Sequence, residues 1–305
     1  MPSIKILRPI IALLLITLFS SVSLYAQNNF DIYLIDYSVQ SGKFVFRTPV
    51  NISSRAGYDS QPFFHPDGRS VFYSSQREGQ TDIYQYDLRK SRTIQLTDTP
   101  DCSEYSPTIT PDRNYFSVIQ QLNQDNMRQP LRKFPVKGGE AEHIFENELK
   151  VGYHAWADNN TVVMFILGSR EKPNTLQVYD TEKGTLYEIT DNIGRCLHKI
   201  PKKDEISFTQ RFTDNESYIK KIDMKTKGIT TITQMLSGSQ DYSWTPDRIL
   251  IAGTGSKLFK YQPGKDTEWI EIADLTEYGI RGINRLAVSP EGNRLVLVAE
   301  DNPDK

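Results

Sequence analysis

The sequence has few of the residues on which disulfide-stapled domains and metal enzymes depend. Among its 305 residues there are only two cysteines and four histidines. Two cysteines do not make a disulfide framework, so a packed core has to supply the stability. The histidines show no spacing typical of a metal site, and no Gly-x-Ser-x-Gly sequence marks a hydrolase of the prolyl-peptidase kind. The formal charge of −2 gives no reason to expect a nucleic-acid partner.

A long apolar run occurs only once, near the start of the chain. Lys5 and Arg8 precede the apolar segment 10–19, and small residues are frequent over 20–26. This order is that of a secretory signal peptide, and the apolar segment is shorter than the ~20 residues of a bilayer crossing. We predict a signal peptide over 1–26, a periplasmic protein, and no membrane span after cleavage. An uncleaved anchor, secretion and association with the envelope are the alternatives.

From residue 27 onward the sequence repeats, which predicts a single domain over 27–305. A turn signal, Pro-Asp-Gly or a variant of it, recurs at intervals of 43 to 47 residues. It lies at Pro66, Pro111, Asp158, Pro201, Pro246 and Pro290. Strand-forming segments flank each turn, as in QPFF and SVFYSS, so each turn predicts an antiparallel hairpin. A second pair of alternating strands follows, for example over 82–97, so each unit has four strands.

The two ends of the repeat region are half units. Residues 30–46 read as a second-half hairpin, and residues 282–300 as a first-half hairpin. Pairing the two halves leaves no sheet edge open. With the five complete units between them, they predict an all-β fold. It is a six-bladed β-propeller of four-stranded antiparallel blades, closed by pairing of the N-terminal and C-terminal half-blades.

The stretch 58–100, YDSQPFFHPDGRSVFYSSQREGQTDIYQYDLRKSRTIQLTDTP, resembles the WD-like propeller repeat of the periplasmic TolB family. The resemblance covers nearly all of 27–305 and is weakest at 194–236, where the turn has become Pro-Lys-Lys. TolB-family members carry an extra α/β domain before the propeller, whereas here the propeller follows the predicted signal peptide directly. The resemblance implies a binding role in the envelope. It also implies a peptidoglycan-associated lipoprotein or another envelope protein as the partner.

Propeller geometry predicts where such a partner binds. The linkers that enter the innermost strands and the loops that join second to third strands lie on one face, around the central channel. These segments are rich in tyrosine, arginine and acidic residues, and tyrosine and arginine are enriched in protein interfaces. The predicted partner-binding residues are Tyr58, Asp59, Arg77, Glu104, Tyr105, Tyr153, Arg170, Arg195, Arg211, Asp241, Tyr242 and Arg285. Packing of the tyrosines between blades, and pairing of the loop arginines with local aspartates, are the structural alternatives.

The acidic turn residues and the tryptophans have structural explanations in the repeat. Carboxylates recur in the same turn of different blades, where each is expected to accept hydrogen bonds from its own turn. They are Asp67, Asp112, Asp247 and Glu291. This placement does not suit the paired carboxylates of glycoside chemistry. Trp156 and Trp244 share one repeat position and are predicted to pack between blades.

The histidines and cysteines fall in the inner strands and the linkers before them. His154 and His198 occupy similar positions in adjacent blades and are expected to approach each other in the channel. A buried imidazole satisfied by a neighbouring carbonyl or water is the favoured interpretation, with a metal or general-base role as the alternative. Cys102 and Cys196 belong to non-adjacent blades, beyond the ~7 Å between Cα atoms that a disulfide allows. Both are predicted to be free thiols.

Together these features predict a monomeric, non-catalytic protein-binding or scaffold module of the cell envelope, with no catalytic residue, metal or cofactor. A propeller enzyme that acts on a polysaccharide in its channel, as a lyase or a hydrolase, is the first alternative. A carbohydrate-binding sensor without catalysis is the second.

Overall fold

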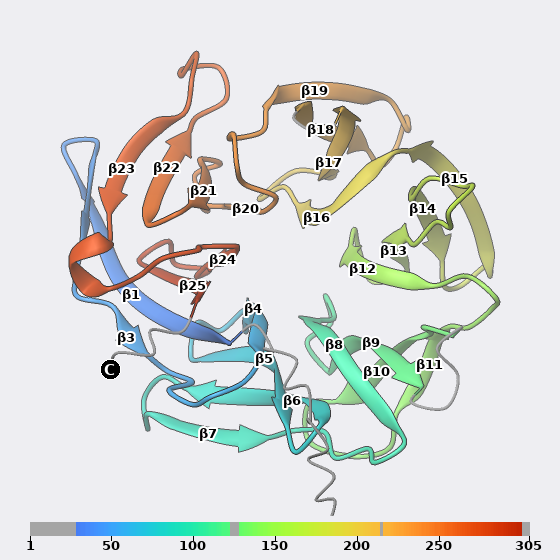
Figure 1. Ribbon diagram of the computed structural model, residues 1–305. Coiled ribbons are helices and arrows are strands. Elements are labelled where there is room, and N and C mark those ends of the chain that lie inside the picture. The colour runs from blue at the N-terminus through green and yellow to red at the C-terminus, as the bar shows by residue number, and fades with distance from the viewer. Residues whose placement is uncertain (1–28, 123–127, 214–215, 301–305) are drawn as a thin grey trace, which may run out of the picture.

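The computed structural model describes residues 29–122, 128–213 and 216–300. The predicted signal peptide, 1–26, lies outside the described residues. Within the described ranges, no helix has the length and apolar character needed to cross a membrane. Six antiparallel sheets stand around a central axis, and each contributes one blade (Figure 1).

Blades 1 to 3 follow one another along the chain. Blade 1 contains β4 (Asp59–Phe64), β5 (Ser70–Arg77), β6 (Gln80–Asp87) and β7 (Arg92–Gln95). Blade 2 contains β8 (Cys102–Ile109), β9 (Tyr115–Leu122), β10 (Leu131–Pro135) and β11 (Glu142–Phe145). Blade 3 contains β12 (Val151–Trp156), β13 (Thr161–Ile166), β14 (Thr175–Asp180) and β15 (Thr185–Asp191). In each blade the first strand is the innermost (Figure 1).

Blades 4 to 6 complete the ring. Blade 4 contains β16 (Ile193–Lys199), β17 (Glu205–Thr213), β18 (Glu216–Asp223) and β19 (Ile229–Gln234). Blade 5 contains β20 (Tyr242–Trp244), β21 (Leu250–Thr254), β22 (Lys257–Tyr261) and β23 (Ile270–Asp274). The 3-10 turn η1 (Thr276–Tyr278) leads to blade 6. Blade 6 contains β24 (Arg285–Val288), β25 (Arg294–Glu300), β1 (Phe30–Gln40) and β2 (Lys43–Phe46), with the short β3 (Val50–Asn51) also paired to β1.

Blade 6 closes the ring as the half units predicted. β1 pairs antiparallel with β25 in an unbroken register that runs from Phe30 opposite Glu300 to Asp36 opposite Arg294. The first and last described strands therefore share a sheet, and the predicted fold class is confirmed. The extra strand β3 was not predicted, because its two residues are too few to show alternation.

The repeated turn between the first two strands forms as its sequence requires. Gly68 in blade 1 and Gly292 in blade 6 have φ of 67° and 68°, a conformation that glycine adopts without strain. Asp67 and Asp112 accept hydrogen bonds from the backbone N–H groups of Arg69 and Asn114, two residues further on. The predicted structural role of these two aspartates is confirmed.

The hydrophobic core consists of six clusters, one between each pair of neighbouring blades. Between blades 1 and 2, for example, the rings of Phe72 and Phe116 meet edge to face with centroids 5.6 Å apart. Trp156 and Trp244 pack at two of these boundaries, as predicted, and each indole N–H reaches a serine on the second strand of the preceding blade. Trp244 Nε1 donates to Ser207 Oγ at 2.8 Å, and Trp156 Nε1 to Ser117 Oγ at 2.9 Å.

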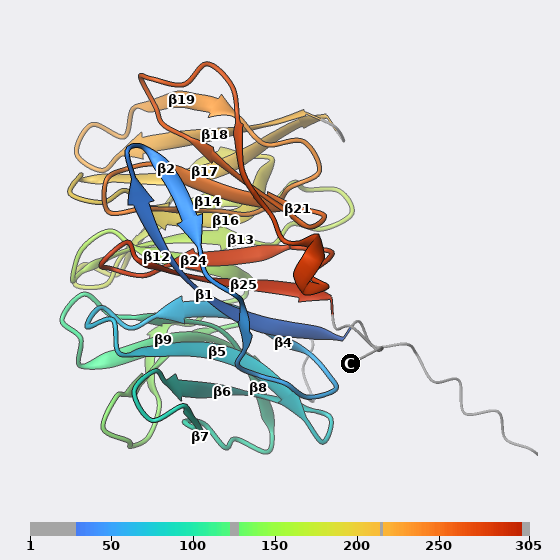
Figure 2. The same ribbon diagram turned by 90° about the vertical axis from the view of Figure 1, so that its left-hand side faces the viewer.

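The disk has two faces, seen edge-on in Figure 2. The entry face carries the linkers into the innermost strands and the loops joining second to third strands. The turn face carries the Pro-Asp-Gly type turns. Phe30 and Glu300, at the ends of the described chain, both lie on the entry face, where Glu300 N–H donates to the Arg281 carbonyl of a linker.

Candidate functional site

Two arginine side chains cross the central channel. Arg285, the first residue of β24 in blade 6, donates from Nη2 to the hydroxyl of Tyr153 at 2.7 Å. Tyr153 belongs to β12 in blade 3, which lies directly across the ring. Arg195, on β16 in blade 4, donates from Nη2 to the backbone carbonyl of Asn284 at 2.9 Å. These bonds link blade 6 to blades 3 and 4, so the channel is bridged across its width.

Asp241 provides a negative charge beside this crossing. Its carboxylate lies 3.6 Å from Arg285 Nη1, and the two side chains are only 11% and 12% exposed. Burial raises the pKa of Asp241, while the charge of Arg285 opposes the rise. Tyr153, Arg195, Asp241 and Arg285 were all predicted as site residues, and the structure brings these four together from four different blades.

A cavity of about 280 Å³ extends from this crossing toward the turn face. Its walls are the later residues of the innermost strands, from Gln61 to Phe63 in blade 1 and from Arg195 to Lys199 in blade 4. Pro111, at a turn between first and second strands, also lines it. None of the other eight predicted binding residues is among the residues that line it.

His154 and His198 both line this cavity, as expected from their shared position in the repeat. His154 is 6% exposed, and its Nε2 is hydrogen-bonded to Ser117 Oγ at 2.6 Å. Burial lowers the pKa of His154 to about 3, so the ring is neutral at physiological pH. The partner of the imidazole is thus a serine hydroxyl from blade 2, rather than the predicted carbonyl or water.

His198 belongs to a second group of ligand-type atoms. Cys196, His198 and Asp241 offer one sulfur, one imidazole nitrogen and one carboxylate oxygen, all within 4.8 Å of one another. The sequence reasoning missed this group, because it treated Cys196 only as a free thiol. Both cysteines are indeed free, as predicted. The signal that was available is the Cys-x-His spacing, which places two side chains on the same side of a strand.

Three other predicted site residues are buried in the interior. Tyr242 is fully buried in the core between blades 4 and 5, with its ring 5.2 Å from that of His198. Glu104 and Asp59 are also fully buried. These three side chains are not on the surface, because their strands and linkers turn them toward neighbouring blades. For Tyr242, the alternative of packing between blades is the one observed.

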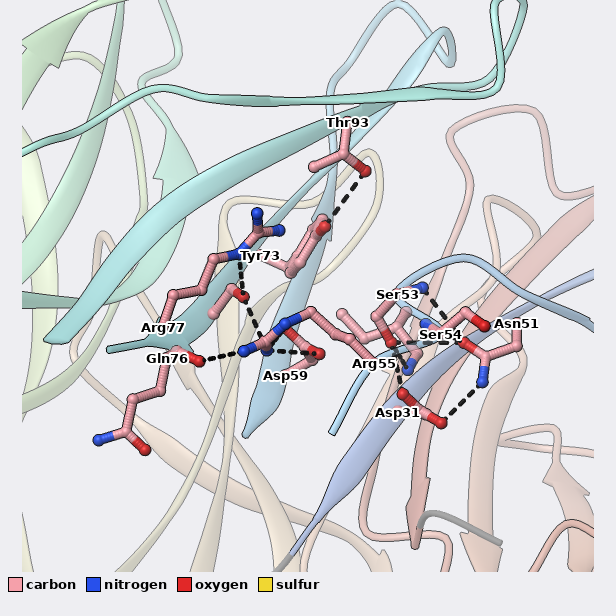
Figure 3. A network of polar contacts seen from close by, with 12 residues as sticks. Asp31, Asn51, Ser53, Ser54, Arg55, Asp59, Tyr73, Gln76, Arg77 and Thr93 are labelled. Carbon is pink, nitrogen blue, oxygen red and sulfur yellow. Dashed lines mark hydrogen bonds and ion pairs between the residues drawn. The ribbon is translucent and has the colours of Figure 1, made fainter. Parts of the chain in front are cut away.

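Asp59 belongs to a polar network at the linker from blade 6 to blade 1 (Figure 3). Arg55 lies between two acceptors: its Nη1 is 3.2 Å from Asp59 Oδ2, and its Nη2 donates to the Gln76 carbonyl at 2.6 Å. Further along the linker, Asp31 of β1 accepts hydrogen bonds from Asn51 and Ser53. The network fixes the linker that leads from the closing blade into the first strand of blade 1.

The loop arginines lie on the entry face, where they were placed by the repeat. Arg77, Arg170 and Arg211 are exposed. The Arg77 guanidinium lies 3.8 Å from the centroid of the Tyr84 ring, so it stacks on an aromatic side chain rather than pairing with an aspartate. Tyr58 and Tyr105 are half-buried near the channel. Burial raises the pKa of Tyr58, and the nearby charge of Arg285 opposes this.

A groove of about 360 Å³ lies on the entry face over blades 3 to 5. Lys172, Arg195 and Arg211 line it together with Met235 and several amide and hydroxyl side chains. Two exposed apolar residues are chain neighbours of this part of the surface: Leu167, just after β13, is 38% exposed, and Phe212, near the end of β17, is 57% exposed. We call this surface the entry groove.

We compared the chain with known protein families, sequences and structures. No family model matches the chain, and no curated protein sequence matches it. Solved structures do match: over 90% of this chain and 99% of the other, it is similar to TolB from Agrobacterium tumefaciens, with a TM-score of 0.68 and 14% identity. TolB from Acinetobacter baumannii gives a TM-score of 0.54 at 12% identity, over 90% of this chain and 64% of that one.

The TolB structures are not alone in sharing the fold. An oligogalacturonate lyase in complex with manganese matches with a TM-score of 0.53 and 15% identity, over 88% of this chain and 78% of the lyase. At these identities the likeness concerns the fold alone. The chain therefore has a TolB-like six-bladed propeller fold, and the resemblance seen in its repeats is confirmed at that level.

Proposed function

We propose that the protein is exported by a signal peptide over 1–26. We further propose that residues 27–305 act as a non-catalytic binding or scaffold module of the cell envelope, which docks a partner protein on its entry face. The observation that carries the proposal is the entry groove, where exposed apolar and guanidinium groups stand on adjacent loops of a rigid ring. Binding residues are frequent on loops that a rigid scaffold positions.

The composition of the entry groove suits a protein partner. Phe212 and Leu167 offer exposed apolar surface beside residues that line the groove. Arg170 lies in the loop after β13, and Arg211 lies near the end of β17. Aromatic residues and arginine are the side chains that most often carry binding energy in protein interfaces. The groove, with a volume of about 360 Å³, is too small to hold a whole domain. We therefore propose that it receives a short segment or a few side chains of the partner. The first candidate, from the resemblance to TolB, is a peptidoglycan-associated lipoprotein.

The proposal is tested by titrating the soluble domain of that lipoprotein into the purified protein and measuring heat release. We expect Phe212→Ser to weaken binding by about tenfold or more, since an exposed aromatic side chain that a partner covers contributes roughly 1.4 kcal/mol or more. Tyr187→Ser is the matched control: Tyr187 is 40% exposed, but it lies on the outermost strand of blade 3, away from the groove.

Affinity capture from native envelopes extends the test to other partners. If the wild-type protein retains no envelope protein, or retains it equally after Phe212→Ser and Tyr187→Ser, the docking role is wrong.

A second candidate function is that of a polysaccharide-acting enzyme or carbohydrate-binding sensor that uses the channel. The cavity beside Arg285, His154 and His198 favours it, because convergent polar groups in a recess are typical of ligand sites. Incubation with purified acidic and neutral polysaccharides, followed by chain-length analysis, separates the two. Shortening of a polysaccharide that Arg285→Gln abolishes and Phe212→Ser leaves unchanged would favour the enzyme.

A further inference from the structure

Ligand-type atoms from two neighbouring blades meet between blades 4 and 5, beside the central channel. Cys196 and His198 lie two residues apart on β16, and Asp241 comes directly before β20 in the next blade. We propose that Cys196, His198 and Asp241 bind one zinc ion. This site does not depend on the docking role proposed above.

The strand geometry explains why these three residues converge. Side chains two residues apart on a strand point to the same side. Cys196 belongs to the core cluster between blades 4 and 5, and the His198 ring contacts that of Tyr242, so both side chains face blade 5. Asp241 approaches from blade 5, where its Oδ1 lies 3.8 Å from Cys196 Sγ. In a tetrahedral zinc site with bonds of about 2.0 to 2.3 Å, ligand atoms lie roughly 3.3 to 3.8 Å apart. The sulfur and the carboxylate oxygen already meet this separation. The other ligand atoms lie no more than 4.8 Å apart, so zinc binding requires them to approach by about 1 Å at most.

Neighbouring groups already orient two of the ligands. Tyr242 N–H donates to Cys196 Sγ at 3.4 Å, and the thiol donates to the Tyr242 carbonyl at 3.5 Å. Burial raises the pKa of the Cys196 thiol, so zinc binding has to displace its proton. Arg285 Nη1 lies 3.6 Å from one carboxylate oxygen of Asp241, Oδ2. The other oxygen, Oδ1, faces the sulfur of Cys196. Such outer contacts hold metal ligands in position and tune their basicity.

The charges and the ligand types together select the metal. A thiolate and a carboxylate bring two negative charges to the ion, and the carboxylate shares its charge with Arg285. Arg195 and Arg285, the nearby guanidinium groups, are engaged with Asn284, Tyr153 and Asp241. A soft sulfur ligand with an imidazole favours zinc over magnesium, calcium or manganese.

The site is open on one side. All three residues line the cavity of about 280 Å³, which gives the ion a path of entry. Three protein ligands leave one tetrahedral position for water or a bound ligand, the pattern of open rather than closed zinc sites.

The test uses the full protein without a polyhistidine tag, freed of metal by a chelator and titrated with zinc and with cobalt(II). We expect one equivalent to bind. We also expect cobalt to develop the near-ultraviolet charge-transfer absorption that only thiolate coordination gives. Cys196→Ser and Asp241→Asn are expected to weaken zinc binding by more than about 100-fold, the upper end of what loss of an outer contact costs. Cys102→Ser, which changes the other free thiol, is the matched control and is expected to bind as the wild type does.

The proposal is overturned if the wild type binds less than one equivalent at micromolar concentration. It is also overturned if cobalt shows no thiolate absorption, or if Cys196→Ser binds zinc as tightly as Cys102→Ser does. Circular dichroism of each variant establishes that it is folded before titration. The wild-type cobalt spectrum decides the question by itself should a variant fail to fold.

Discussion

Glu104 is a carboxylic acid in a fully buried position of β8. Thr99 Oγ1 and Gln120 Nε2 donate hydrogen bonds to its Oε1, at 2.5 Å and 3.0 Å. Burial raises the pKa of Glu104 from 4.5 to about 7, and the nearby carboxylate of Asp82 adds to the rise. The residue was predicted to contact a partner, but its environment makes it a proton-binding group of the interior.

The stability of the protein should therefore depend on the protonation of Glu104. Because its pKa is higher in the folded than in the unfolded state, the folded state binds more protons between about pH 4.5 and 7. The contribution of Glu104 to the free energy of unfolding falls as pH rises through this range, by on the order of 3 kcal/mol in total. Glu104→Gln lacks this loss, so its stability relative to the wild type should increase from about pH 5 to pH 8.

Urea unfolding of both proteins at the two pH values measures the difference. Glu188→Gln, which changes an exposed carboxylate in blade 3, is the control and should show no such trend. A wild-type-to-variant difference that stays constant with pH would show that Glu104 does not titrate in this range.

At the scale of elements, β1 has two unlike halves. Its first seven residues pair with β25 and close the ring, whereas its last four pair with β2 at the outside of the disk. Ile32, in the first half, is fully buried between blades 6 and 1, and Val39, in the second half, is 51% exposed. One strand therefore contains both a closing segment and a surface segment.

Truncation at these two positions should have very different effects. Ile32→Ala is expected to lower the free energy of unfolding by about 2 to 5 kcal/mol, because it removes buried methyl groups and leaves a cavity. Val39→Ala should change it by no more than about 0.5 kcal/mol. Chemical denaturation of the two variants makes the comparison, and equal losses would contradict the closing role of the first half of β1.

The strands and the closure could be predicted because their signals are local. A Pro-Asp-Gly turn and period-two alternation fix a hairpin wherever they occur, and the orphan half units at 30–46 and 282–300 leave one way to close the ring. The predicted turn forms even in blade 4, where its sequence is Pro-Lys-Lys: Ile200 N–H donates a hydrogen bond to the Glu205 carbonyl across it.

The channel could be predicted only in part. Arg195, Asp241 and Arg285 were placed near it, but which groups they contact depends on how far each side chain reaches across the ring. The bond from Arg285 to Tyr153 joins residues 132 apart in sequence, and no pattern in the sequence encodes that length. Tyr242 was misplaced because a linker residue and the first residue of the next strand look alike in sequence, although one is at the surface and the other in the core.

At the scale of the whole molecule, the first and last described strands end side by side. Phe30 and Glu300 are paired residues of adjacent strands, so a short linker can join them. A circular permutant that joins these residues and opens the chain between Lys137 and Gly138 breaks only an exposed turn between β10 and β11. All the blade interfaces of the parent protein remain possible in it.

We expect this permutant to fold with an unchanged circular dichroism spectrum and with a free energy of unfolding within about 2 kcal/mol of the parent, because loop closure depends only weakly on length. A second permutant opened between Phe72 and Tyr73, inside the buried strand β5, is the control and should not fold. Failure of the first permutant would mean that continuity of the chain at 137–138 matters more than the ring closure does.

The position of both ends on the entry face has a practical consequence. A protein attached to a sensor chip or bead through a short tether at Phe30 or Glu300 would hold its entry groove against the support and direct the opposite side into the solvent. Metal ions and small sugars would then reach the interior freely, whereas a large partner would be sterically screened. Measurements with both components free in solution avoid that bias.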